Sequence, residues 1–325
     1  MERVLTARRG AEMPRPEIND FKPFISIVIN CYNGEKFLKE ALESVICQTY
    51  DKWEVIFWDN QSTDGSRSIF ESYKDVRFRY FIAPNHTPLG EARNAACRMA
   101  MGEWFAFLDC DDVWVDRKLE LQIEIIAKSS PRIGLIYSPF SIISENKDDN
   151  RIKKMRRDFS LLSAKPHEES YIFNALLERN YIVFSSILIR GRIFMEIGGI
   201  DTTLVQNEDY ELLLKASQAC TAACINIAAV KYRIHLSNNT HANYDAGYME
   251  NFAILEKLPQ TKPVREALTR NYLRFAVFSV LRRDLVKSLL IIYRHFSIRE
   301  IVRIIMQWFL RRFVSWIPVN SYLDR

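Results

Sequence analysis

The sequence predicts an α/β domain built on a mostly parallel central sheet, and three observations lead to this prediction. Short apolar runs rich in β-branched residues alternate with amphipathic helical segments over residues 24–128. Clusters of polar residues follow three of these runs, where a strand would end. The 325 residues are 48% hydrophobic and 26% charged, which is ordinary for a globular protein with a full core.

The first half of the chain shows this alternation most clearly. The expected strands are residues 24–30, 53–58, 76–82 and 104–108. The expected helices are residues 35–47, 67–74, 90–101 and 116–128. In the first helix, apolar residues recur at helical spacing from Phe37 to Val45. Because a helix separates each strand from the next, the strands are expected to be mostly parallel.

Past residue 130 the rhythm changes. Further strands are expected at residues 133–143, 181–190 and 225–235. A polar and basic loop is expected at 144–170, and a helix at 207–219 follows a glycine turn.

Charge is distributed unevenly along the chain. The net charge is +5, from 45 Lys and Arg against 40 Asp and Glu. Residues 261–325 carry 13 of these cations and 4 of the anions, so a slightly acidic body is followed by a basic tail. We expect three parts: a mobile arm at 1–22, the α/β domain at 23–245, and a basic, amphipathic helical region at 246–325.

Compartment and membrane signals are weak. Residues 1–20 hold no apolar stretch of the kind found in a secretory signal, and no apolar window is long enough to predict a spanning helix. The six cysteines form no CxxC pair. Reduced thiols in a cytosolic compartment are therefore favoured over a zinc site or a disulfide framework.

Three polar clusters are expected to meet at one edge of the sheet. They are residues 30–33, 59–64 and 109–112, and each follows a predicted strand. In parallel sheets, ligands bind outside the carboxyl ends of the strands. This edge is therefore the first candidate for chemistry.

Residues 109–112, Asp-Cys-Asp-Asp, place three carboxylates within four positions. Such carboxylates repel one another unless a cation lies among them, and an oxygen-rich open site suits Mg²⁺ or Mn²⁺. The alternative is an Asp-rich turn that caps the next helix. Similarly, Asp59 would accept hydrogen bonds from a ribose hydroxyl or a base N–H, or would form an ordinary Asx turn. No GxGxxG or Walker sequence is present.

Two further positions have both a functional and a structural explanation. Glu208 and Asp209 begin a predicted helix, where the helix dipole favours acids, but Asp209 would also suit a general base beside a cleft. His235 ends a predicted strand. A single histidine is commonly structural, although beside a metal cleft it would bind phosphate or the metal.

Taken together, these segments resemble family 2 of the inverting glycosyltransferases, which have the GT-A fold. Residues 26–66 resemble the opening nucleotide-binding unit of that family, and residues 89–114 resemble its central segment with the metal-binding DXD motif. Residues 198–215 resemble the acceptor-side segment with its ED pair, and residues 232–240 a frequent closing strand. The resemblance covers about residues 24–240.

The resemblance implies a role for each matching residue. Asn30, Tyr32 and Asp59 would hold the base and ribose of a nucleotide sugar, most simply a UDP-sugar, with Glu35 beside them. Arg93 would approach the diphosphate or sugar, and Asp109 the ribose or sugar. Asp111 would bind Mg²⁺ or Mn²⁺, and His235 would help to hold the metal and leaving diphosphate. Asp209 would be the catalytic base.

The same resemblance implies direct displacement with inversion at the anomeric carbon. Asn30-Cys31 and Asn60-Gln61 stand where Pro-Thr and Asp-Gly are common in the family, so the base contacts differ. The QxxRW motif of processive synthases is missing, which favours addition of one sugar per encounter. The expected acceptor is a glycan or lipid-linked glycan in surface polysaccharide synthesis. A nucleotidyltransferase and a non-catalytic scaffold with the same fold are the alternatives.

The basic tail contains a segment, residues 298–317, with one narrow polar stripe and a wide apolar face. A helix of this kind fits the plane of a membrane interface and would place the protein on the inner face of the cell membrane. The alternative is a helical subdomain packed on the domain or on a second subunit, giving a homo-oligomer. No nucleic-acid recognition motif accompanies the charge, so no nucleic-acid partner is expected.

Overall fold

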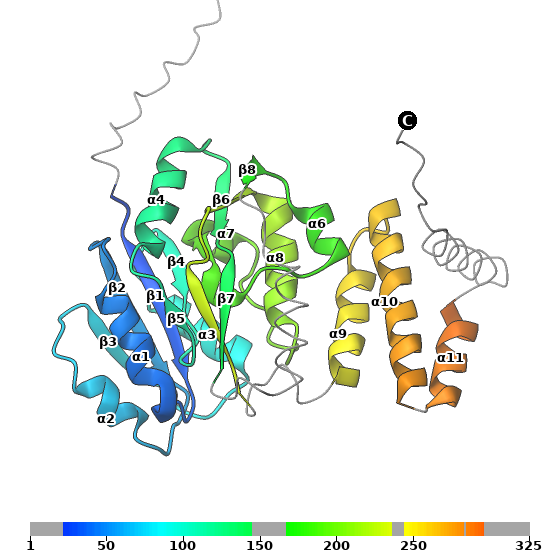
Figure 1. Cartoon of the computed structure of the whole chain (residues 1–325), viewed down its shortest axis with the longest axis horizontal. Helices are drawn as coiled ribbons and strands as arrows, with labels where there is room; N and C mark the ends of the chain where they lie inside the picture. Colours follow the sequence, from blue (N-terminus) through cyan, green and yellow to red (C-terminus); the bar gives the residue numbers. More distant parts are fainter. Residues whose placement is uncertain (1–21, 145–166, 236–243, 283, 296–325) are drawn as a thin grey trace, which may run out of the picture. The chain divides into compact units, whose positions relative to one another are not determined.

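The structure, a computed structural model, describes residues 22–144, 167–235, 244–282 and 284–295. The chain divides into two compact units, Met1–Asn239 and Thr240–Arg325 (Figure 1). Nearly all of the expected N-terminal arm, most of the polar loop at 144–170 and the amphipathic segment at 298–317 lie outside the described residues.

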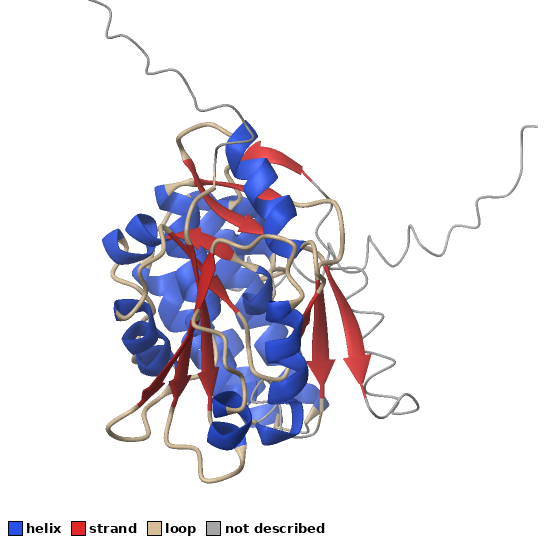
Figure 2. Cartoon of the chain, turned by 90° about the vertical axis from the view of Figure 1, so that its left-hand side faces the viewer, coloured by secondary structure: helices blue, strands red, loops and turns tan. Residues whose placement is uncertain are grey.

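An eight-stranded sheet with the order β3-β2-β1-β4-β9-β6-β10-β8 forms the centre of the first unit. The strands are β1 Ile25–Cys31, β2 Trp53–Asp59, β3 Phe78–Ile82, β4 Trp104–Phe107, β6 Ile133–Tyr137, β8 His167–Ser170, β9 Leu188–Arg190 and β10 Thr221–Cys224. Strand β1 pairs in parallel with β2 and β4, whereas β9 runs antiparallel between β4 and β6. The predicted α/β fold is confirmed, and neighbouring parallel strands end at the same edge (Figure 2).

Helices cover the sheet because its strands are apolar on both faces. The helices of this unit are α1 Glu35–Ile46, α2 Ser66–Glu71, α3 Leu89–Arg98, α4 Lys118–Lys128, α6 Phe173–Glu178, α7 Gly191–Glu196 and α8 Glu208–Ala219. Alternate residues of β1, from Ile25 to Cys31, join apolar residues of α1 and α4 in one buried cluster. Helix α3 contacts β1 and β2, and right-handed crossovers assign it to the opposite face.

Three expected strands are shorter than the sequence suggested. Residues 133–143 form β6 and then β7 (Phe140–Ser144), with a break at Ser138 and Pro139. Residues 181–190 form a 3₁₀ turn at Phe184–Ser186 before β9, and residues 225–235 contribute β11 (Val230–Ile234). Strands β7 and β11 join β5 (Val113–Trp114) in a second sheet of order β5-β11-β7. A continuous apolar run does not reveal where the chain leaves one sheet for another.

The second unit is helical within its described residues. It contains α9 Tyr244–Lys257, α10 Lys262–Leu281 and α11 Leu285–His295. Its core is aromatic, formed by Phe252, Tyr272 and Phe275. Among the helices that the structure describes, none combines the length and the apolar character needed to cross a bilayer.

Candidate active site at the carboxyl edge of the sheet

The loops after β1 and β2 hold each other through side chains that cap backbone groups. The N–H of Glu35 donates to Asp64 Oδ2 at 3.0 Å, and the N–H of Gly65 donates in return to Glu35 Oε2 at 2.6 Å. The N–H of Thr63 donates to Asn33 Oδ1 at 2.8 Å. Burial opposes the charge of Asp64, but hydrogen bonds from Ser66 and from the Glu35 N–H lower its pKa. Glu35 therefore fixes the start of α2, and its expected contact with a nucleotide stays a prediction.

Polar groups from β1, β2 and β3 meet where these strands end. Asp59 is buried, and its two oxygens accept from the Ser62 N–H at 2.7 Å and from the Tyr80 hydroxyl at 2.6 Å. Asn30 and Trp58 are paired across β1 and β2. The Asn30 Nδ2 and Trp58 Nε1 atoms are buried without a hydrogen-bond partner among the described residues. Two donors are thus available to a ligand with acceptor atoms.

Two exposed rings lie beside this group. Tyr32 is 52% exposed, and its ring centroid lies 4.2 Å from that of His86. The Nδ1 of His86 is 2.9 Å from the carbonyl oxygen of Asn60, which orients the imidazole. Flat aromatic surfaces next to unfilled donors suit a nucleobase. The sequence analysis selected Tyr32 but missed His86 and Trp58.

A buried arginine joins the two acidic segments that the sequence singled out. Arg93 of α3 is 4% exposed; its Nη2 donates to Asp109 Oδ1 at 2.6 Å and its Nη1 to Glu208 Oε1 at 3.0 Å. The guanidinium also lies over the ring of Phe184, 4.0 Å from its centroid. Burial opposes the charge of Arg93, but Asp109 and Glu208 outweigh it and raise its pKa. Asp109 and Glu208, 99 positions apart in the sequence, therefore belong to one site.

Asp209 lies next to this pair at the start of α8. Burial and the neighbouring charge of Glu208 raise its pKa to about 7, although Arg93 acts in the opposite direction. One oxygen of Asp209 accepts from the N–H of Tyr210 at 2.5 Å. A carboxylate that changes protonation near neutral pH is suited to accept a proton from a hydroxyl.

Residues 109–112 form a loop that we call the acidic loop, and its second half contacts β11. Asp111 Oδ2 is 2.9 Å from His235 Nε2, and the His235 ring packs on Phe37 with centroids 5.1 Å apart. Both side chains are partly exposed. The sequence analysis assigned these two residues to a metal, and the structure brings them together.

Asp112 and Arg233 hold the acidic loop in place from its buried side. Asp112 is buried, and its oxygens accept from the Arg233 N–H at 2.8 Å and from the Ser185 hydroxyl at 2.6 Å. Burial, with repulsion from Asp111 and Asp109, raises the pKa of Asp112 well above its usual range. The Arg233 side chain donates to the carbonyl of Asp111 at 2.7 Å and pairs with Glu40 of α1. Sequence reasoning missed Ser185 and Arg233; a cation inside the apolar pattern of β11 was the available signal for Arg233.

The side chains near Asp111 and His235 supply only part of the coordination shell of a divalent cation. Among the residues that the structure describes, no group of three or more His, Cys, Asp and Glu side chains is arranged to hold a metal. Asp111 and His235 would supply one oxygen and one nitrogen. Mg²⁺ and Mn²⁺ commonly take a small number of protein ligands and complete their shell with water and substrate phosphates. The residues present therefore fit a cation that is bound together with a diphosphate.

Comparison with known sequences gives a consistent family. Residues 26–198 match the model of Glycosyl transferase family 2. An uncharacterized glycosyltransferase of Rickettsia typhi is 29% identical over 230 residues, which cover 69% of this chain and 68% of that protein. WfgD of Escherichia coli, a UDP-Glc:α-D-GlcNAc-diphosphoundecaprenol β-1,3-glucosyltransferase, is 27% identical over 216 residues, covering 66% of this chain and 78% of WfgD.

Solved structures share the fold at low sequence identity. The structure of Staphylococcus aureus TarS residues 1–349 with UDP-GlcNAc matches with a TM-score of 0.60 and 17% identity, covering 76% of this chain and 71% of that one. The Pyrobaculum calidifontis mannosyltransferase PcManGT with GDP-Man and Mn²⁺ matches with a TM-score of 0.55 and 16% identity, covering 91% and 84%. At these identities the likeness concerns the GT-A architecture.

Proposed function

The chain belongs to glycosyl transferase family 2 and is a glycosyltransferase, and we propose that it moves one sugar at a time from a nucleotide-diphosphate sugar to a glycan or lipid-linked acceptor, with inversion. The contact of Arg93 with both Asp109 and Glu208 carries this proposal. It joins the strand-end loops, which would hold the donor, to the start of α8, which would face the acceptor. A site for two substrates would thereby form around the buried Arg93 guanidinium.

The nucleotide sugar would bind at the carboxyl ends of β1 and β2. Tyr32 and His86 would stack on the base, and the unfilled donors Asn30 Nδ2 and Trp58 Nε1 would meet its acceptor atoms or those of the ribose. Asp109 would contact the sugar or ribose, and Arg93 would stabilise negative charge nearby. A uridine base is the simplest choice, because WfgD uses UDP-Glc and TarS is seen with UDP-GlcNAc.

Asp209 would act as the general base. Because its pKa is raised to about 7, about half of the molecules carry the carboxylate at neutral pH. The carboxylate would accept the proton of the acceptor hydroxyl while the hydroxyl oxygen attacks the anomeric carbon from the face opposite the nucleotide. The carbon–oxygen bond to the nucleotide diphosphate would break in the same step, which inverts the configuration. Arg93 would keep Glu208 and Asp109 oriented.

Asp111 and His235 would hold Mg²⁺ or Mn²⁺ together with the donor diphosphate. The bound cation would supply charge neutralisation for the departing diphosphate. Arg233 and Asp112 would keep the loop that carries Asp111 in position, through the Asp111 carbonyl and the Arg233 N–H. The Mn²⁺ found with PcManGT supports this choice of cation by analogy of fold.

The acceptor would be lipid-linked and the protein would work at the inner face of the cell membrane. WfgD acts on a diphosphoundecaprenol-linked sugar, which is anchored in a bilayer. In the helical unit, α11 exposes one apolar stripe at helical spacing, formed by Val286, Leu289, Leu290 and Tyr293. Residues 261–325 carry an excess of nine positive charges, which anionic headgroups would attract. We therefore propose that this stripe faces an anionic bilayer.

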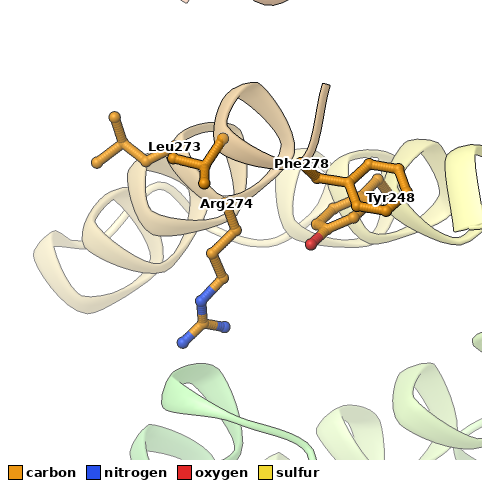
Figure 3. Close-up of a pocket in the computed structure, with 5 residues that line it drawn as sticks. Tyr248, Leu273, Arg274 and Phe278 are labelled. Carbon is orange, nitrogen blue, oxygen red and sulfur yellow. The ribbon is translucent and has the colours of Figure 1, made fainter. Parts of the chain in front are cut away.

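A shallow apolar hollow of about 410 Å³ lies on the same unit, on α9 and α10. Its lining residues are Tyr248, Leu273, Arg274, Val277 and Phe278. The rings of Tyr248 and Phe278 lie together, with centroids 5.7 Å apart, and the Arg274 guanidinium points away from them (Figure 3). This arrangement of apolar side chains beside a cation is compatible with a lipid surface.

Flotation with vesicles tests the membrane proposal. The full chain is expected to float with vesicles of phosphatidylglycerol and not with neutral vesicles, and Leu289→Glu with Leu290→Glu to reduce flotation at least fivefold. Flotation unchanged by this pair, or a dimer in solution that the pair dissociates, would contradict the bilayer as occupant of the stripe.

An assay of sugar transfer from a nucleotide sugar to an acceptor tests the proposed function itself. The purified chain is given UDP-Glc, UDP-GlcNAc or GDP-Man with Mn²⁺ and a soluble GlcNAc-diphospho-lipid analogue, and the product is read by mass spectrometry. One nucleotide sugar is expected to add the mass of a single sugar, with the inverted anomeric configuration read from the NMR coupling of the anomeric proton, and with no transfer in EDTA. Nucleotide transfer to a sugar phosphate, or the binding of no nucleotide at all, would favour a nucleotidyltransferase or a non-catalytic scaffold instead.

A further inference from the structure

Two cysteines face each other in the middle of the proposed donor site. Cys31 is the last residue of β1, and Cys110 is the second residue of the acidic loop. Cys31 belongs to the buried cluster on the face of the sheet covered by α1 and α4, and Cys110 packs against that cluster. Neither is required for the steps described above.

The strand register accounts for this proximity. Strands β1 and β4 pair in parallel from Ile25 with Trp104 to Val28 with Phe107, an offset of 79 residues. The pairing continues one residue further, because the Leu108 N–H donates to the Val28 carbonyl at 3.1 Å. Continued past the last paired residues, the same offset would bring Cys31 level with Cys110. Neighbouring strands are separated by about 5 Å, which lies within the range of Cα separations that a disulfide spans.

The sulfur atoms themselves are close. A Cβ built on Gly34 would lie 2.8 Å from Cys31 Sγ and 2.9 Å from Cys110 Sγ, so both sulfurs face the same bare α-carbon. Ser62, Ser66 and the backbone of Gly34 also lie beside the Cys31 sulfur. Cys31 is buried, whereas Cys110 is partly exposed.

We propose that Cys31 and Cys110 form a reversible disulfide that switches the glycosyltransferase off, an inference that rests on the proposed function for its effect but not for the bond itself. The Cys110 sulfur attacks a small disulfide, loses its proton, forms a mixed disulfide and releases one thiol. The Cys31 sulfur then attacks the Cys110 sulfur and releases the second thiol. The protein loses two electrons and two protons, and one small disulfide becomes two thiols.

The bond would fix two loops that the substrate must enter. Cys31 adjoins Asn30 and Tyr32, and Cys110 lies between Asp109 and Asp111. Drawing the sulfurs together over Gly34 would tie the base-binding loop to the acidic loop and displace both from their reduced positions. A donor could then no longer reach both sets of contacts.

Peptide mapping tests the bond directly. The full chain is treated with excess oxidised glutathione, remaining thiols are alkylated, and digested peptides are analysed by mass spectrometry. A linked pair containing Cys31 and Cys110 is expected, lighter by two hydrogens and absent from Cys31→Ser. Cys47→Ser, which removes an exposed cysteine, is expected to give the same linked pair as the unaltered chain. Complete alkylation of both cysteines after oxidation, or glutathione retained on Cys110 without the link, would overturn the proposal.

Binding and rate measurements test the switch. Oxidation is expected to weaken UDP binding and lower the transfer rate at least tenfold, with recovery in dithiothreitol. A linked pair with unchanged UDP affinity and rate would contradict the switch. If the chain transfers no sugar under any condition, UDP binding still reports on the bond, so failure of the proposed function is distinguished from failure of this inference.

Discussion

The two halves of the candidate site use the same acidic residue types in opposite ways. In the loops after β1 and β2, Glu35 and Asp64 accept hydrogen bonds from backbone N–H groups, and the pKa of Asp64 is lowered. Around the acidic loop and α8, carboxylates crowd together, and burial raises the pKa values of Asp112 and Asp209.

The difference shows that the local environment of a carboxylate determines its role. A carboxylate whose oxygens are filled by fixed N–H donors is stable in its ionised form and serves as a scaffold. A carboxylate among other carboxylates is costly to ionise, and it is therefore ready to take up a proton. The comparison predicts that carboxylate variants in the first half lose stability, and that carboxylate variants in the second half lose activity.

Asp209→Asn is expected to give the largest effect. Removing the base should lower kcat at least about 10³-fold, and UDP affinity should change less than about twofold, because the donor contacts lie elsewhere. Glu211→Gln is the matched control, since Glu211 lies on the same turn but pairs with Lys215 at 3.2 Å. Transfer by Asp209→Asn at more than a tenth of the normal rate would contradict the assignment.

The same variant separates activity from stability through pH. The folded pKa of Asp209 lies above its unfolded value, so the native state holds an extra proton between about pH 4 and pH 7. Stability from this group is fully present at the acid end and is lost as the pH rises through 7. Thermal unfolding should therefore show Asp209→Asn to be more stable than the unaltered chain at pH 8 and similar near pH 4. Lower stability at pH 8 would argue against a raised pKa.

Arg233→Met is expected to have the next largest effect, on stability. Arg233 is 7% exposed, and the variant would leave Glu40 and the Asp111 carbonyl without its side chain. Leaving the Asp111 carbonyl without this donor costs about 2 kcal/mol. Glu40→Gln is the control, because Glu40 is half exposed and should cost less than about 1 kcal/mol. Equal costs for both variants in urea unfolding would remove Arg233 as the support of the acidic loop.

Asp111→Asn tests the metal half of the site. We expect kcat/KM to fall about 10²-fold and the Mn²⁺ concentration for half-maximal activity to rise about tenfold, because one of two protein ligands loses its charge. His235→Gln should change the Mn²⁺ requirement in the same direction. Asp116→Asn, beyond the acidic loop, serves as the control. A Mn²⁺ titration unaffected by either site variant would exclude this pair as the metal ligands.

Glu35→Gln is expected to give the smallest effect. It weakens one hydrogen bond to the Gly65 N–H, which should cost about 1 kcal/mol of stability, with kcat unchanged within about twofold. Glu43→Gln in the same helix is the control, because Glu43 is exposed and 3.9 Å from Lys39. A large loss of UDP affinity with normal stability would instead make Glu35 a nucleotide ligand, as the family resemblance implies.

Local patterns in the sequence were sufficient for the main sheet and the position of the site. The expected strand at 53–58 is β2, and the expected helix at 35–47 is α1, each within one residue at its ends. Asp109 was selected because ligand sites follow the ends of parallel strands, whereas Arg93 and Asp209 were selected because their segments resemble the family. The structure adds that Arg93 bridges Asp109 and Glu208.

Residues that act across the fold were not predictable from their neighbours in the sequence. Ser185 lies in an apolar run, yet it donates to Asp112, 73 positions earlier. Arg233 contacts Glu40 across 193 positions. Whether such side chains meet depends on how the second sheet passes behind the acidic loop, and hydrophobic periodicity contains no information on that.

The central claim is that Asp209 is a carboxylic acid that titrates near neutral pH beside Arg93. Carboxyl ¹³C chemical shifts of aspartate-labelled protein, followed against pH and assigned by the missing signal in Asp209→Asn, measure this directly. The account predicts a midpoint of about 7 for Asp209. A midpoint near 4, the ordinary value for aspartate, would contradict it.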